Sequence, residues 1–330
     1  MRTTLATLAM AILWTVPGFG QTDKTFYFTQ PASPADITAM STMIRTLVDL
    51  QDITPDEKHL SVSARGPIEK LVLADWLFHQ LDRPGGPTAE YKMTGEKEEV
   101  VRILRVSPTA TSQDLTAVTT AIRTVCDLQR LFPYESRQAI VGRGAPDKIA
   151  AADWMVRQLL PPDGQAPTAD SPAFPAPTTD SMTPDVKSVI QIFRMDPKTT
   201  NAQLTSTVTA IRTVADIQRL FPFESGMAIV ARDTPAKVAV AEWLVHELAK
   251  PADAGAVHQT TMPGLMDGVV RLFYAGKEAD VTPLVTQIRF TLDIRRLFPF
   301  GQPAAIVLRG RPDQMPAVEA MVAKFAADGR

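Results

Sequence analysis

Residues 121–136 read AIRTVCDLQRLFPYES, and residues 210–225 read AIRTVADIQRLFPFES. Thirteen of these sixteen positions are identical. The phrase returns in altered form as QIRFTLDIRRLFPFGQ from Gln287 and as MIRTLVDLQDITPDEK from Met43. Repetition of this kind predicts a tandem array built from four copies of one small module.

Fixed spacings inside the copies indicate one shared fold. An arginine follows 21 residues after the isoleucine of each Ile-Arg pair, at Arg65, Arg143, Arg232 and Arg309. A tryptophan follows 32 residues after that isoleucine at Trp76, Trp154 and Trp243, and Ala320 takes this place in the fourth copy. Because no insertion separates these landmarks, we expect the same fold four times.

Each copy reads as a strand, a helix, a hairpin and a second helix. The first strands are expected at 26–28, 100–106, 189–195 and 269–274, where apolar residues alternate or run together. Leu115, Val118, Ile122 and Val125 recur at helical spacing, and Pro146 suits the first turn of the second helix. The expected fold class is α+β, with four β-α-β-β-α modules of about 60 residues, a size that folds alone only marginally.

Composition sets the expected boundaries. We place module 1 at 24–83, module 2 at 99–162, module 3 at 187–251 and module 4 at 268–330. Residues 163–186 are rich in Pro, Ala and Thr and predict a semi-extended linker, with shorter breaks at 82–98 and 250–267. This pattern favours beads over one continuous core, and it leaves the extent of docking between modules open.

The first twenty residues are typical of a signal peptide, with Arg2 before an apolar run from Leu5 to Val16. We expect cleavage between Gly20 and Gln21, rather than an N-terminal membrane anchor, because the run is short for a membrane span. No later segment has the apolar length of a membrane helix. The single cysteine, Cys126, permits no intramolecular disulfide and is expected to be a small buried residue. These features favour the periplasm.

Motifs for catalysis and nucleic-acid binding are absent from the sequence. The net charge is −2, and the basic residues form no run or stripe. The four histidines show no paired metal-ligand spacing, and no phosphate loop or nucleophile elbow occurs. We therefore expect no enzyme activity, no catalytic or metal-binding residue and no cofactor.

The repeated arginines have two structural interpretations. Arg123 and Asp127, like their equivalents in the other copies, stand four residues apart on the first helix and suit a surface ion pair. The strand-end arginines, Arg143 and its equivalents, are expected to cap the carbonyl groups of a helix end. An anionic ligand is the functional alternative for the first set.

Two aromatic features are candidate interface residues. Trp154 lies off the apolar stripe of the second helix, so Trp76, Trp154 and Trp243 either dock a neighbouring module or subunit or fold over their own first helix. The Leu-Phe-Pro-Phe/Tyr phrase should end the first helix, because proline cannot continue it. Its aromatic residues suit a partner surface, with core packing as the alternative: Phe132, Tyr134, Phe221, Phe223, Phe298 and Phe300.

These patterns resemble the N-terminal periplasmic modules of bacterial type II and type III secretion secretins. The stretch from Val62 to Pro67, followed by His79-Gln80-Leu81-Asp82-Arg83-Pro84, is similar to that family's phrasing, and the resemblance covers all four copies. It implies a KH-like fold and ring-building protein contacts. The chain lacks any segment that resembles the secretin pore domain, so only the module fold and an oligomerising tendency are implied.

Two functions remain open from the sequence. The first is a periplasmic, non-enzymatic scaffold or assembly protein that contacts protein partners, including itself or envelope secretion components. The alternative is a monomeric array of binding modules for an envelope protein or a glycan.

Overall fold

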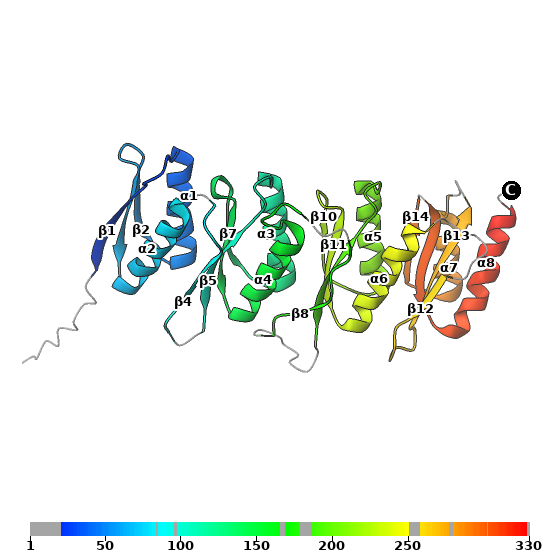
Figure 1. The fold of residues 1–330 in the computed structure, drawn as a ribbon. Coiled ribbons are helices and arrows are strands. Elements are labelled where there is room, and N and C mark those ends of the chain that lie inside the picture. Colours follow the sequence, from blue (N-terminus) through cyan, green and yellow to red (C-terminus); the bar gives the residue numbers. More distant parts are fainter. Residues whose placement is uncertain are drawn as a thin grey trace, which may run out of the picture. The chain divides into compact units, whose positions relative to one another are not determined.

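The computed structural model describes residues 21–83, 85–95, 98–165, 169–178, 187–250, 258–276, 280–301 and 303–328 (Figure 1). The expected signal peptide and its cleavage point lie outside these residues. The chain divides into two compact units, Met1–Gly86 and Pro87–Arg330. The first unit contains one module and the second contains three.

The first unit has the expected β-α-β-β-α order. Its elements are β1 (Thr22–Tyr27), α1 (Pro34–Val48), β2 (Asp52–Asp56), β3 (Ser61–Gly66) and α2 (Ile68–Asp82). The strands form an antiparallel sheet in the order β1-β3-β2. Phe26, Val62 and Ile44 are buried between this sheet and the two helices.

The second unit repeats this arrangement three times. Module 2 consists of β4 (Ala89–Lys92), β5 (Val100–Arg105), α3 (Ser112–Cys126), β6 (Arg130–Tyr134), η1 (Glu135–Arg137), β7 (Ala139–Gly144) and α4 (Pro146–Leu159). Module 3 consists of β8 (Phe174–Pro175), β9 (Val189–Arg194), α5 (Asn201–Val214), β10 (Arg219–Phe223), β11 (Ala228–Asp233) and α6 (Pro235–Ala249). Module 4 consists of β12 (His258–Thr261), β13 (Val269–Gly276), α7 (Thr282–Leu292), β14 (Arg296–Phe300), β15 (Ala304–Gly310), η2 (Pro312–Gln314) and α8 (Met315–Asp328). The expected α+β repeat is confirmed.

Each module of the second unit carries a fourth strand that the sequence did not reveal. The sheet orders are β4-β5-β7-β6, β8-β9-β11-β10 and β12-β13-β15-β14, all antiparallel. The added edge strands β4, β8 and β12 come from the segments expected to be linkers. In the expected linker 163–186, Phe174 pairs with Ile190, and Ser171 and Ala176 are buried. Phe174 and Pro175 of this segment therefore belong to the sheet of module 3.

The first helix ends before the Leu-Phe-Pro phrase, contrary to the expectation that the proline ends it. Asp127 follows α3 with φ 53°, and Asp49 and Asp293 hold the same left-handed conformation. Aspartate tolerates this conformation, which turns the chain out of the helix. The phrase itself is an edge strand: Pro133 lies opposite Ile140 at the sheet edge, where a missing N–H is tolerated.

Candidate interaction surfaces

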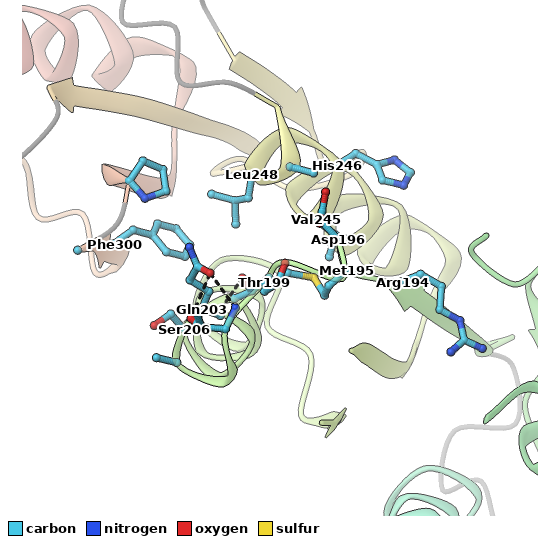
Figure 2. A pocket seen from close by; sticks show the side chains of 16 residues that line it. Arg194, Met195, Asp196, Thr199, Gln203, Ser206, Val245, His246, Leu248 and Phe300 are labelled. Carbon is cyan, nitrogen blue, oxygen red and sulfur yellow. Dashed lines mark hydrogen bonds between the residues drawn. The ribbon is translucent and has the colours of Figure 1, made fainter. Parts of the chain in front are cut away.

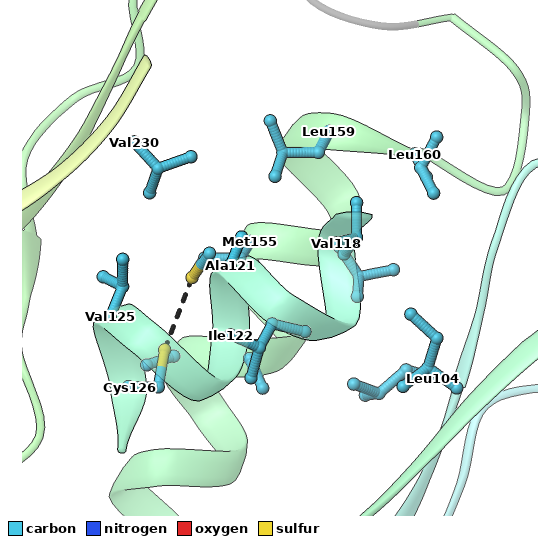
Figure 3. Packing of buried hydrophobic residues seen from close by; sticks show 14 of the residues in the cluster. Leu104, Val118, Ala121, Ile122, Val125, Cys126, Met155, Leu159, Leu160 and Val230 are labelled. Atoms are coloured by element: carbon cyan, nitrogen blue, oxygen red, sulfur yellow. Dashed lines mark hydrogen bonds between the residues drawn. The ribbon is translucent and has the colours of Figure 1, made fainter. Parts of the chain in front are cut away.

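Modules 2 and 3 share one apolar core. The helices α3 and α4 lie between the sheet of module 2 and that of module 3 (Figure 1). Ala121 and Val125 on α3 are buried in the same cluster as Ile192, Phe223 and Val230 of module 3. Figure 3 shows Val230 facing these helices from the neighbouring strand. The expectation of separate beads is wrong for these modules.

Modules 3 and 4 repeat this joint. Ala210 and Val214 on α5 are buried in one cluster with Leu272, Phe300 and Val307 of module 4. The sheets of modules 3 and 4 thus have apolar contacts on both faces. Since successive side chains of a strand point to opposite faces, a sheet covered on both sides requires continuous apolar runs. This requirement explains the repeated Ala-Ile-Val segments.

An arginine from module 3 caps the end of a helix in module 2. Nη1 of Arg232 donates to the carbonyl oxygen of Val125 at 2.8 Å and lies 3.4 Å from Asp127 Oδ2. Arg219 also pairs with the Asp127 carboxylate. The carbonyl end of a helix carries partial negative charge, so it favours these cations. We call this arrangement, an arginine pair on a helix end of the preceding module, the arginine clamp.

The joint between modules 3 and 4 has a second arginine clamp. Nη1 of Arg309 donates to the carbonyl oxygen of Val214 at 2.9 Å, and Nη1 of Arg296 lies 3.3 Å from Asp216 Oδ1. Burial raises the pKa of the Asp216 carboxyl, but the hydrogen bond and charge of Arg296 and the charges of Lys237 and Arg309 outweigh it, so the pKa lies below its ordinary value. Asp216 is therefore an anion in this joint at neutral pH.

The expected capping role is confirmed for Arg232 and Arg309, and the structure adds that the helix belongs to the preceding module. Arg143 pairs with Glu99, its Nε lying 2.8 Å from the carboxylate. Arg65 pairs with Asp23 at 3.5 Å and is half exposed.

The expected ion pair four residues apart on the first helix is wrong. Nη2 of Arg123 donates to the carbonyl oxygen of Leu131 at 2.9 Å, and Arg212 and Arg289 make the same bond to Leu220 and Leu297. The physical reason is the left-handed conformation of Asp127, which takes its side chain off the helical face that Arg123 occupies. The arginine thereby fastens the first helix to the edge strand of its own sheet.

The aromatic residues of the Leu-Phe-Pro phrase lie in the joints. Phe223 and Phe300 are buried in the two shared cores, and Phe221 and Phe298 are partly buried against them. At the equivalent positions of β6, Tyr134 is buried and Phe132 is half-buried. For modules 3 and 4, the surface that these residues contact is the preceding module of the same chain.

The tryptophans occupy three different settings. Trp154 stacks on Phe174 with ring centroids 5.0 Å apart and an interplanar angle of 23°. Because Phe174 belongs to β8, Trp154 contacts the sheet of the next module. Trp243 is partly buried against the core that modules 3 and 4 share, and Trp76 is half-buried on α2.

A cavity of about 470 Å³ opens where α5 and α6 meet the β14–β15 turn. Met195, Val245, Leu248 and Phe300 supply its apolar surface, and Thr199, Gln203, Ser206 and His246 supply polar groups. Figure 2 shows Phe300 at one end of this pocket and Arg194 at the other. The sequence does not predict this pocket.

Comparison of copies 2 and 3 would have revealed the signal for this pocket. By the fixed spacing, Leu160 and Val118 of module 2 correspond to Ala249 and Thr207 of module 3. Leu160 and Val118 belong to the buried core of module 2, whereas Ala249 and Thr207 line the pocket. Smaller and more polar residues in module 3 therefore leave space that module 2 fills.

Two outer faces are mainly polar. On the sheet of module 1, the side chains pointing away from α1 and α2 include Thr25, Asp52, Thr54 and Arg65, all exposed. On module 4, exposed Gln287 and Thr291 stand at the positions that are Ala121 and Val125 in module 2.

Among the described residues, no group of three or more His, Cys, Asp or Glu side chains is placed to hold a metal ion. Within the same residues, every helix is too short or too polar to cross a membrane. The histidines make separate contacts: His246 with Asp170 at 2.9 Å, and His258 with Glu247 at 2.6 Å.

These features define the chain as a tandem array of one α+β module, with three modules stacked helix face to sheet face. No family model and no curated protein matches it. Similar solved structures include Aeromonas hydrophila ExeD, at 14% identity and a TM-score of 0.17, covering 69% of this chain and 41% of that chain. The ETEC pilotin–secretin AspS–GspD complex matches at 10% identity and a TM-score of 0.17, covering 69% of this chain and 38% of that chain.

The chain thus spans about two fifths of each of these neighbours. A secretin structure occurs among them, as the sequence resemblance implies, but a TM-score of 0.17 carries no argument for a common arrangement or function.

Proposed function

We propose that this chain is a periplasmic, non-enzymatic scaffold that binds other proteins and is itself a monomer. The observation that carries the proposal is the pair of continuous cores that join modules 2, 3 and 4. Joints sealed by apolar residues and arginine clamps hold three modules in fixed register, as a scaffold requires. The mainly polar outer face of the module 1 sheet favours a monomer over self-assembly through stacking.

Expression of the full chain with a C-terminal affinity tag in a double-membraned bacterium tests this proposal. We expect the tagged protein in the periplasmic fraction, with the mass of one chain by light scattering and with a defined protein attached after formaldehyde cross-linking of whole cells. A cytoplasmic protein, a ring-sized oligomer, or the absence of any protein adduct would contradict it.

A second candidate is a monomeric array that holds a glycan. The pocket beside α5 favours it, because hydroxyl, amide and imidazole groups surround an apolar surface there. Binding of peptidoglycan fragments to the purified chain, lost in Ser206→Trp and without protein adducts in cells, would support this candidate over the scaffold.

A further inference from the structure

We propose that the outer helical face of module 4 binds a partner protein through a β-sheet that carries apolar side chains and a pair of arginines. The face is defined by Gln287, Phe290, Thr291 and Asp293. The proposal rests on the proposed scaffold function and names the kind of partner that the scaffold binds.

The two internal joints show what covers this face in the other modules. On α3, Ala121 and Val125 are fully buried beneath the sheet of module 3, and Asp127 at the helix end receives Arg219 and Arg232. The joint on α5 follows the same plan. A sheet with two arginines is therefore the surface that this helical face accepts in this fold.

Module 4 retains the anionic part of the site. Asp293 follows α7 in the left-handed conformation that Asp127 has after α3, and its side chain is 81% exposed. Its carboxylate lies 3.2 Å from the Nε of Arg295, a side chain that is itself 87% exposed. An ion pair this exposed contributes little, so Asp293 remains available to a partner's arginine.

The outer helical face of module 4 keeps an apolar side chain, but at a different position from the other modules. Gln287 and Thr291 replace the buried alanine and valine, but Phe290 replaces a threonine of the other copies and is 87% exposed. An exposed aromatic side chain is the type of residue that contributes most at interfaces. Polar residues around one aromatic anchor suit a joint that forms and separates, unlike the permanent joints inside the chain.

A second copy of this chain does not fit the face. The sheets of modules 3 and 4 are covered inside the array, and Val101, Ile103 and Val141 on the sheet of module 2 are buried. The exposed sheet of module 1 carries Asp52 where Arg219 and Arg296 stand in the other modules. Asp52 would meet Asp293 with like charge, so the complementary sheet belongs to a different protein.

Photo-cross-linking in cells tests this inference with the full chain. A photoreactive phenylalanine analogue replaces Phe290 in one variant and Met266, which is equally exposed at 87%, in the control. We expect an adduct at position 290 whose partner peptide comes from a β-strand adjacent to two arginines, at a yield at least tenfold above the control. An adduct with a second copy, equal yields at both positions, or a partner peptide from a helix or loop would overturn the inference.

A charge change provides the second measurement. Asp293→Asn keeps a residue that tolerates the left-handed backbone and removes the anion. We expect it to lower the adduct yield at least tenfold, whereas Asp313→Asn, at another exposed aspartate of module 4, leaves it unchanged. Equal yields from both variants would overturn the inference. If formaldehyde still attaches a protein partner in that case, the scaffold function stands; if no protein is attached by either method, both fail.

Discussion

The arginines near the ends of β3, β7, β11 and β15 show how one residue type takes different roles as its surroundings change. Arg232 and Arg309 are buried and bind helix-end carbonyl groups of another module, whereas Arg65 is half exposed beside Asp23. A hydrogen bond to a charged group in a buried site contributes about 1.5–3 kcal/mol, and an exposed ion pair contributes about 0–1 kcal/mol.

We therefore expect Arg232→Ala to lower the free energy of unfolding of the full chain by about 2–3 kcal/mol. The loss arises because the carbonyl oxygen of Val125 and the Asp127 carboxylate both lose a donor. Arg65→Ala is the matched control, with an expected change below about 1 kcal/mol. Urea titration followed by circular dichroism measures both, and equal losses would contradict the role of Arg232.

Cys126 is predicted to be unreactive in the folded protein. Burial raises the pKa of its thiol to about 12, and its Sγ lies 3.3 Å from the Sδ of Met155 (Figure 3). The thiolate, which is the reactive form, is therefore scarce at pH 8. We expect a disulfide reagent to label the unfolded chain at least a hundredfold faster than the folded chain, and comparable rates would show that the α3–α4 contact opens readily.

Residue identity predicted these local roles only in part. The sequence indicated that Cys126 is buried and that the strand-end arginines cap a helix, and the structure confirms both for the residues named above. It could not indicate that the helix belongs to the preceding module, because spacing within one copy carries no information about which copy packs where.

At the scale of elements, local sequence propensity does not predict all of the helix ends and strands that tertiary strand pairing produces. The sequence predicts that Pro133 ends the first helix, but α3 already ends at Cys126, because Asp127 turns the chain out of the helix and the residues from Arg130 form the strand β6. The strand β8 has only two residues, and its proline-rich surroundings gave no alternation to detect. Its existence depends on pairing with β9, which local sequence does not encode.

The contact between α6 and the strands of module 4 is predicted to weaken in acid. Nδ1 of His258 and Nζ of Lys250 each lie 2.6 Å from a carboxylate oxygen of Glu247, and the hydroxyl of Tyr274 donates to the Glu247 carbonyl. Burial raises the pKa of the Glu247 carboxyl, but the hydrogen bonds and charges of Lys250 and His258 outweigh it and hold the pKa below its ordinary value of 4.5.

A carboxyl group whose pKa is lowered by folding stabilises the protein above its unfolded pKa, and this stabilisation is lost as the pH falls through the folded value. We expect Glu247→Gln to cost about 1.5–3 kcal/mol at pH 7 and progressively less below pH 4.5. Thermal unfolding between pH 3 and pH 7 measures the difference. Glu57→Gln, at an exposed position of module 1, is the control, with an expected change in stability at pH 7 within about 0.5 kcal/mol. A cost for Glu247→Gln that is constant over this range would refute the assignment.

At the scale of the molecule, the sequence predicts the repeat, but it does not predict that modules 2, 3 and 4 pack against one another. Linker composition favoured separate beads, whereas β4, β8 and β12 widen the sheets and the helices of modules 2 and 3 pack on the following sheet. Apolar residues on both faces of a strand were visible as continuous runs. Which second surface covers them is a property of the assembled array, in which stability depends on both the modules and the interfaces between them.

A charge introduced into one joint should therefore split the unfolding of modules 2, 3 and 4 into two separate transitions. Val230 is fully buried between module 3 and the helices of module 2, and Ser63 holds the same position on the sheet of module 1, where it is half exposed. Burying an unpaired carboxylate costs several kcal/mol, so Val230→Asp should separate module 2 from modules 3 and 4 and replace one calorimetric transition of residues 87–330 by two. Ser63→Asp should leave that transition intact, with a change in stability within about 0.5 kcal/mol.

If Val230→Asp preserves a single transition at an unchanged midpoint, the shared core does not couple the modules, and the fixed register on which the scaffold proposal rests is lost.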